Sequence, residues 1–227
     1  MLPQPRRRWA FFPRSVISDH DNPSAHLYRA MAHVVTSRDD EARFYEERAN
    51  PWLRSMLLNE GADAFRTFQQ RYPHVSYVTY EPRSGHRLAE WLSLALSTVD
   101  IVVVDPAAPS TIVQWIGELT RPKLQTFLLD ADGQLVARDE VPGFVQLYEA
   151  LCVPAPEAES LGNLGARHTI TYGPEKTEFG TNGSAARHVE QTAEQLVEQL
   201  TATFDERVAR TAKHDVGEIN DPESDQS

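Results

Sequence analysis

The sequence predicts an α/β protein: a Rossmann-like three-layer domain with a mostly parallel sheet, followed by a long C-terminal amphipathic helix. Short apolar segments typical of strands alternate along the chain with segments of helical periodicity. The clearest strand, DIVVVD at 100–105, contains four successive β-branched residues without polar alternation, which is typical of a strand covered on both faces. Strands separated by helices of this length normally join as right-handed crossovers in a parallel sheet.

The strands and helices can be placed in order along the chain. The predicted strands run over 8–12, 42–46, 75–80, 100–105, 124–129, 150–153 and 168–172. One predicted helix starts at Pro23 and another follows Ser84. Further helices are predicted at 51–70, 112–119, 156–164 and 184–213, and a short one is predicted inside 144–153. Asn-Pro pairs precede the first two helices, as a cap and a first helical residue do. Gly61 is a predicted break within the second helix.

Four parts of the chain are distinguished by composition and periodicity. Residues 1–7 are expected to be flexible, 8–182 to form the Rossmann-like domain, and 214–227 to form a disordered acidic tail. The helix at 183–213 carries an apolar stripe that has to be buried. The stripe is formed by Val189, Ala193, Leu196, Val197, Leu200, Phe204 and Val208. It is predicted to pack on the domain, or alternatively on a partner helix or a second copy.

Composition excludes several classes of protein. A formal net charge of −11 disfavours nucleic-acid binding, which depends on clustered Lys and Arg. No segment approaches the roughly 20 apolar residues of a membrane-spanning helix. Cys152 is the single cysteine, so no internal disulfide forms and a soluble cytoplasmic protein is expected. The apolar context EALCVP predicts that its thiol is buried and inert.

Candidate site residues are those that follow the predicted strands, because ligands of open parallel sheets bind beyond the carboxyl ends of the strands. The ligand-binding candidates are Arg14, Ser15, His20, Asn50, Arg83 and Ser110. A role as helix caps is the favoured interpretation for four residues at these positions: Asn22, Asn50, Ser84 and Ser110. Trp52, Trp91 and Trp115 each fall in an apolar helical stripe, where core packing is favoured over stacking on a sugar.

Glycine-rich phosphate loops and metal-ligand spacings are missing from the sequence. Neither G-x-G-x-x-G nor G-x-x-x-x-G-K-[ST] follows the first strand, and the eight histidines show no spacing such as H-E-x-x-H. No metal site is therefore predicted. Asp130-Ala131-Asp132 could hold a divalent cation that bridges a nucleotide diphosphate, but LLDADGQL also suits a simple turn, which is the favoured interpretation.

Four segments carry a resemblance to a known family: EARFYEERANPWL, VDIVVVDPAAPSTIVQWI, TFLLDADGQL and ALCVPAPEAESLGNLGARHTITYGP. Together, over about 9–174, they resemble the amino-terminal half of the CgeB-like glycosyltransferases, a group with the two-domain GT-B architecture. Gly133-Gln134 stands where the family has Thr-Pro after its D-x-D turn. The resemblance implies the acceptor-side half of a glycosyltransferase. Since only a helix follows at 183–213, it also implies a second subunit that supplies the nucleotide-sugar site.

If the chain is the acceptor-side half of a glycosyltransferase, its carboxylates include the base that deprotonates an acceptor hydroxyl. The candidate catalytic carboxylates are Glu47, Asp105, Asp130 and Asp132. A nucleotide sugar is the expected donor substrate, no further cofactor is required, and the partner is a second glycosyltransferase subunit or a second copy bound through 184–213. One alternative is a noncatalytic ligand-binding or regulatory Rossmann-like protein. A second alternative is a small nucleoside-processing enzyme that uses Asp105 or Asp130 on a glycosidic bond.

Overall fold

A seven-stranded parallel sheet forms the centre of the chain, as the computed structural model shows for residues 6–17, 23–81, 85–119, 121, 123–131, 135, 143–155, 167–173 and 184–217. The strand order is β3-β2-β1-β4-β5-β6-β7. The strands are β1 Arg8–Phe12, β2 Glu41–Glu47, β3 Ser76–Tyr80, β4 Ile101–Val104, β5 Gln125–Leu129, β6 Ala150–Pro154 and β7 Thr169–Tyr172. The predicted α/β, Rossmann-like fold class is confirmed.

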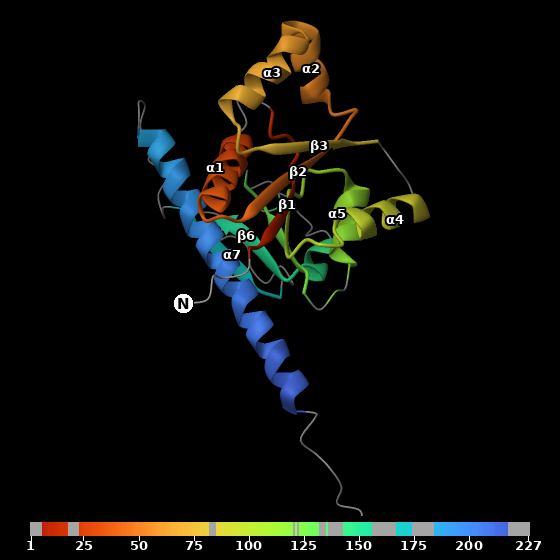
Figure 1. Cartoon of the computed structure of the whole chain (residues 1–227), viewed down its shortest axis with the longest axis vertical. Helices are drawn as coiled ribbons and strands as arrows, with labels where there is room; N and C mark the ends of the chain where they lie inside the picture. Colours follow the sequence, from red (N-terminus) through yellow and green to blue (C-terminus); the bar gives the residue numbers. More distant parts are fainter. Residues whose placement is uncertain are drawn as a thin grey trace, which may run out of the picture.

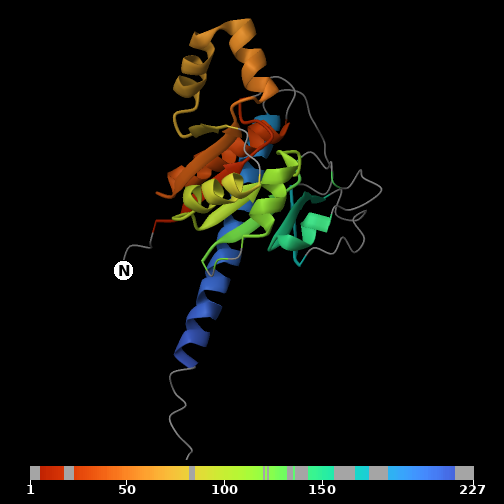
Figure 2. The ribbon, with the colours of Figure 1, turned by 90° about the vertical axis from the view of Figure 1, so that its right-hand side faces the viewer.

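Helices cover both faces of this sheet (Figure 1). They are α1 Pro23–Ser37, α2 Pro51–Glu60, α3 Ala62–Arg71, α4 His86–Ala95, α5 Ser110–Gly117, the 3-10 helix η1 Gly143–Leu147, and α7 Ser184–Gly217. The α1 and α7 helices pack on one face, and α4, α5 and η1 pack on the other. The α2 and α3 helices form a hairpin that stands beyond the carboxyl ends of the strands (Figures 1 and 2).

The two faces of the strands alternate in the way that a doubly covered sheet requires. Phe11 and Phe44 belong to the core under α1 and α7, whereas Phe12 and Tyr45 belong to the core under α4 and α5. All four residues of β4 are fully buried, which confirms the interpretation of DIVVVD as a strand covered on both faces.

Most predicted element boundaries agree with the structure, and one cap does not. Gly61 separates α2 from α3 with a φ of 77°, a conformation that glycine adopts without strain. The prediction that Ser110 caps its helix is wrong: Pro109 occupies the cap position and Ser110 is the first helical residue of α5. Asn22, Ser84 and the predicted helix at 156–164 lie outside the described residues.

The α7 helix lies along α1 and buries part of its apolar stripe there. Ala193, Leu196, Val197 and Leu200 are fully buried in the core formed with α1, whereas Val208 is 44% exposed. Beyond the domain the helix continues past the amino-terminal ends of the strands, as both ribbon views show (Figures 1 and 2). None of the helices in the described part of the chain combines the length and the apolar character needed to cross a membrane.

An ion pair attaches α7 to the segment that precedes β1, and its loss should measurably weaken the fold. One guanidinium nitrogen of Arg7 donates to both carboxylate oxygens of Asp205, at 2.9 and 2.8 Å. We expect Asp205→Asn to lower the free energy of unfolding by about 1 kcal/mol at low salt and by less at high salt. Urea unfolding at two salt concentrations measures this. Glu206→Gln, which affects only an exposed pair with Arg210, serves as the control and should change stability far less. If both variants lowered the stability equally, the ion pair between Arg7 and Asp205 would not be what attaches α7 to this segment.

Candidate functional site

The candidate site lies at the carboxyl ends of β1 and β4, where the order of the sheet changes direction. From β1 the chain proceeds through β2 to β3 on one side, and from β4 it proceeds through β5 to β7 on the other. Such a switch point is where open parallel sheets bind their ligands. Phe12 pairs with Val104, and the amide of Asp105 donates to the carbonyl of Phe12 at 2.9 Å. The loops after β1 and β4 therefore start side by side.

Residues 13–17, which we name the β1 loop, are held from the β2 side by two buried side chains. Glu46 accepts a hydrogen bond from the amide of Val16 through Oε1, and its Oε2 accepts one from Asn50 Nδ2 at 3.0 Å. The same Asn50 nitrogen donates to the carbonyl of Arg14 at 2.9 Å. Glu46 is 1% exposed and Asn50 is 6% exposed. We name this pair of side chains the Glu46–Asn50 bracket.

The β1 loop is also held from within and from α1. Arg29, a buried residue of α1, donates from its guanidinium to the carbonyl of Val16 at 2.9 Å, and its guanidinium carbon lies 4.7 Å from the ring centroid of Tyr72. The hydroxyl of Ser15 accepts the amide of Ile17 at 3.3 Å. Together with the Glu46–Asn50 bracket, these contacts fix four backbone groups of one short loop, so its shape is set before any ligand arrives.

The orientation of the Asn50 amide follows from its place at the start of α2. Its Oδ1 accepts the backbone amide of Trp52 at 2.9 Å, which is the contact of a helix cap, and Pro51 occupies the first helical position. With the oxygen committed to the helix, the nitrogen has to face Arg14 and Glu46. The cap predicted at Asn50 is confirmed, and the same side chain is part of the candidate site.

Burial dominates the protonation of Glu46. Desolvation raises the pKa of this carboxyl to about 8, although hydrogen bonds from Val16, Tyr77, Ser15 and Asn50 act in the opposite direction. The Tyr77 hydroxyl lies 3.3 Å from Oε2, and burial together with the neighbouring Glu46 raises the pKa of Tyr77 above its ordinary value. The hydroxyls of Tyr77 and Ser15 can accept as well as donate, so they can accommodate the protonated carboxyl.

The carboxylates predicted to be catalytic are distributed along the rim. Asp105 directly follows β4, is 5% exposed, and accepts the amide of Ala107 through Oδ1 at 2.8 Å. Asp130 directly follows β5, is 1% exposed, and accepts the amide of Leu135 through Oδ2 at 2.7 Å. Each of these side chains thus contacts the turn that follows its own strand. Glu47 is half-buried at the end of β2. Because its side chain alternates with that of Glu46, it lies on the α4 face of the sheet.

The predicted ligand-binding residues fall into three groups. Arg14, Ser15 and Asn50 are brought together around Glu46. Ser110 is exposed in the first turn of α5. His20, Arg83 and the remaining catalytic candidate, Asp132, lie outside the described residues.

Sequence reasoning placed Glu46 at the end of its strand without selecting it as a site residue, gave no role to Arg29, and placed Trp52 in the core. Glu46 follows Ala42 and Phe44 in the alternation of β2, and this pattern could have placed its carboxyl on a buried face. Arg29 is a buried arginine in an apolar helix and carried no signal of its own. The interpretation of Trp52 as a core residue is wrong, since its side chain is 40% exposed. Trp91 and Trp115 are half-buried and pack against the core, as expected.

A second polar feature lies at the opposite end of the strands. A cavity of about 710 Å³ is lined there by Arg8, Glu41 and Ser76 among others, at the starts of β1, β2 and β3. Glu41 pairs with both Arg6 and Arg8, at 3.5 and 3.7 Å. This cavity is separate from the candidate site, and its charges connect the segment before β1 to β2.

Metal and thiol chemistry find no support in the described part of the chain. Among the described residues, no three His, Cys, Asp or Glu side chains are grouped so as to hold a metal ion. Cys152 is fully buried in β6, so its predicted burial is confirmed, and desolvation raises the pKa of its thiol.

Comparison with known proteins identifies no family for this chain. No family model matches the sequence. No curated protein sequence matches it either, so the CgeB-like resemblance stays a prediction. Among solved structures, the chain is similar to an α,α-trehalose-phosphate synthase (UDP-forming) from Burkholderia xenovorans in complex with glucose-6-phosphate, with 10% identity and a TM-score of 0.35. The match covers 89% of this chain and 43% of that enzyme, so the chain spans less than half the length of this structural neighbour.

Proposed function

We propose that this chain is a glycosyltransferase-like domain that binds the sugar-containing acceptor at the switch point between β1 and β4. In this proposal, transfer requires a nucleotide-sugar site on a second polypeptide. The proposal combines the sequence resemblance to the acceptor-side half of the CgeB-like enzymes with the geometry of the β1 loop.

The observation that carries the proposal is the fixation of the β1 loop by buried side chains. Glu46, Asn50 and Arg29 are all at least nine-tenths buried, and each holds a backbone group of this loop. Burying polar side chains is costly unless they are fully hydrogen-bonded, and here three of them are used to hold a single loop. Glu46 and Asn50 also belong to the segment FYEERANPW that resembles the family. The resembling residues are therefore the ones that shape the proposed binding loop.

Asp105 is the proposed general base. It follows β4, which pairs with β1, and its own amide donates to the carbonyl of Phe12, the residue before the β1 loop. An ionised carboxylate can accept several hydrogen bonds, and Oδ1 of Asp105 accepts the amide of Ala107. In the proposed reaction, Asp105 takes the proton of the acceptor hydroxyl while the oxygen attacks the anomeric carbon of the donor, and the bond from that carbon to the nucleoside diphosphate breaks, so that the diphosphate leaves.

The donor site is proposed to come from a separate subunit. Four of the seven residues of the α7 stripe are buried against the chain's own core: Ala193, Leu196, Val197 and Leu200. Little of the stripe before Phe204 is therefore left for a second copy of this chain. A distinct second polypeptide fits the proposal better than a homodimer formed through 184–213.

The test is amide NMR of the full chain titrated with free hexoses, hexose phosphates, nucleosides and nucleotide sugars. We expect hexose-containing acceptors to shift the amide signals of Ser15, Val16 and Asp105, with a Kd around the millimolar range, and Asp105→Asn to weaken this binding about tenfold. Asp63→Asn, on exposed α3, is the control and should leave binding unchanged. Tight binding of a nucleotide sugar by the chain alone would contradict the split arrangement. If no sugar shifted these amides, the proposed site would be wrong.

A noncatalytic ligand-binding or regulatory role is the second candidate. It is favoured by the contacts of Asp105 and Asp130, whose carboxylates each accept an amide of the following turn, as structural side chains do. The two candidates predict the same binding but differ in turnover. Isolation of the native chain with a second Rossmann-like subunit, followed by an assay for sugar transfer, distinguishes them. Release of free base from nucleosides would instead support a nucleoside-processing enzyme.

A further inference from the structure

We infer that Arg14 and Trp52 together form a recognition platform for a phosphate ester of a ring-bearing molecule, such as a sugar phosphate. This inference names the ligand class of the site proposed above and rests on that proposal. It is carried by the exposure of Trp52, the charge of Arg14, and the way in which Asn50 holds the two residues together.

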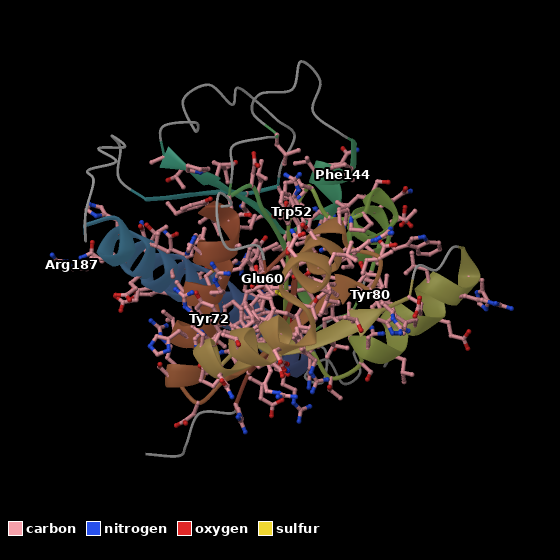
Figure 3. All side chains as sticks on the ribbon, turned by 90° about the horizontal axis from the view of Figure 1, so that it is seen from above. Trp52, Glu60, Tyr72, Tyr80, Phe144 and Arg187 are labelled. Atoms are coloured by element: carbon pink, nitrogen blue, oxygen red, sulfur yellow. The ribbon has the colours of Figure 1, made fainter. Side chains whose placement is uncertain are left out.

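Trp52 exposes a large apolar surface at the rim where the proposed ligand binds. Its side chain is 40% exposed, whereas Trp9, in the core, is 1% exposed. Figure 3 looks onto the carboxyl ends of the strands and shows Trp52 near the centre of that face. An indole in this position offers a flat surface on which a sugar ring or a base can stack.

Arg14 places a positive charge over this indole. Its guanidinium carbon lies 5.6 Å from the centroid of the Trp52 ring. Arg14 is exposed, and among the described residues no carboxylate lies within ion-pair distance of its guanidinium. Glu46, Asp105 and Asp130 at this rim are buried, and the chain as a whole carries a formal net charge of −11. An exposed guanidinium with no described carboxylate paired to it attracts an anion.

The two side chains are set by one buried amide. Asn50 donates from Nδ2 to the carbonyl of Arg14 and accepts the amide of Trp52 at Oδ1, both at 2.9 Å. The backbones of both residues are therefore positioned by the Glu46–Asn50 bracket, and the side chains meet without needing a ligand to order them. A platform organised in advance loses less entropy on binding.

The chemistry of the pair selects a ring that carries a phosphate. A planar guanidinium presents paired N–H donors that match two phosphate oxygens, whereas a hydroxyl group engages them more weakly. The indole beside it favours the apolar face of a pyranose or a nucleobase over a small inorganic anion. A ligand that combines both groups gains from both contacts at once. Hexose phosphates and nucleoside monophosphates share this chemistry.

The indole N–H signals of the tryptophans provide the test. The chain has four tryptophans, and Trp52→Phe identifies the signal of Trp52. The full chain is titrated with a hexose phosphate, with UMP, with glucose and with inorganic phosphate. We expect at least one of the two phosphate esters to shift the Trp52 signal and to bind about tenfold more tightly than either glucose or inorganic phosphate. The signal of Trp9, whose Nε1–H donates to Asp40 at the other end of β1, is the internal control and should not move.

Matched variants separate the platform from general effects of the rim. Trp52→Ala and Arg14→Gln should each weaken binding of the preferred phosphate ester by about tenfold. Two control variants lie on α2, the helix that carries Trp52. Leu58→Ala removes an apolar side chain that is 74% exposed, and Arg54→Gln removes an exposed positive charge. Both controls should leave the affinity unchanged. The hydrogen bonds from the Asn50 side chain to the backbones of residues 14 and 52 do not depend on the substituted side chains. All four variants are therefore expected to fold.

Three results would overturn the inference, and the first two leave the proposed function standing. The first is binding that shifts Ser15 and Asp105 but leaves the Trp52 signal in place; the site then stands without the platform. The second is an affinity for both phosphate esters that is no higher than the affinity for glucose or for inorganic phosphate. The third is absence of binding by every probe. Failure of the proposed function is recognised separately, by Ser15, Val16 and Asp105 amides that no sugar shifts.

Discussion

Raising the pH from about 6 to about 9 is expected to lower the free energy of unfolding by about 3 kcal/mol through Glu46 alone. Burial raises the pKa of this carboxyl in the folded chain to about 8 from its ordinary value of 4.5. Between these two values the folded state binds a proton that the unfolded state has released. The stabilisation from this proton is complete below the unfolded pKa and is lost as the pH rises through the folded pKa. Urea unfolding at a series of pH values measures the slope.

Glu46→Gln is the variant that isolates this effect. Glutamine cannot titrate, so the fall in stability above about pH 6 should largely disappear, although its amide faces Asn50 Nδ2 and costs about 1–2 kcal/mol at low pH. Glu60→Gln, at the exposed end of α2, is the control and should retain the wild-type slope. His74, whose pKa is lowered by burial and by His33, acts at lower pH and in the opposite direction, and it is present in both variants. A Glu46→Gln protein with the wild-type slope would show that another group titrates in this range.

Asn50→Asp should destabilise the fold by about 3 kcal/mol near neutral pH, although aspartate is as good a helix cap as asparagine. The cap contact with Trp52 survives because an oxygen remains in place. The donor to Arg14 and to Glu46 is lost, however, and a carboxylate takes its place against the Arg14 carbonyl and beside the Glu46 carboxyl, 3.0 Å from the former nitrogen. Thermal and urea unfolding measure the loss.

Asn50→Ser separates the missing donor from the added charge. Serine also caps a helix but adds no charge, so its stability should lie between those of the wild type and Asn50→Asp. Lowering the pH should bring Asn50→Asp towards Asn50→Ser, since the new carboxyl becomes protonated. If Asn50→Asp were as stable as the wild type at neutral pH, the amide of Asn50 would not be shared between the helix and the β1 loop.

The fold could be predicted from the sequence because its signals are local. Four successive β-branched residues marked β4, Asn-Pro marked the start of α2, and Gly61 marked its end, and each feature reflects the backbone conformation of a few neighbouring residues. The length of the connecting helices and the handedness of crossovers predicted a mostly parallel sheet, whereas the order of its strands was not predicted.

The site was less accessible to sequence reasoning because it depends on which face a side chain takes and on contacts far along the chain. Glu46 and Glu47 are adjacent and chemically identical, yet alternation directs Glu46 to the loop after β1 and Glu47 to the other face. Trp52 stands in an apolar helix, but α2 extends beyond the sheet and leaves the indole exposed. No local pattern reports how far a helix overhangs the element beneath it.

The pairing of α1 with α7 has a consequence for how the protein is made. Met31 and Val35 of α1 are buried in the core that Leu196 and Leu200 complete, although more than 150 residues of chain lie between them. During translation the first helix emerges early and its partner emerges only after the intervening strands, so this apolar surface stays uncovered while those strands are synthesised. Nascent chains halted before residue 184 should therefore bind chaperones that recognise apolar segments, and should be released once α7 has left the ribosome.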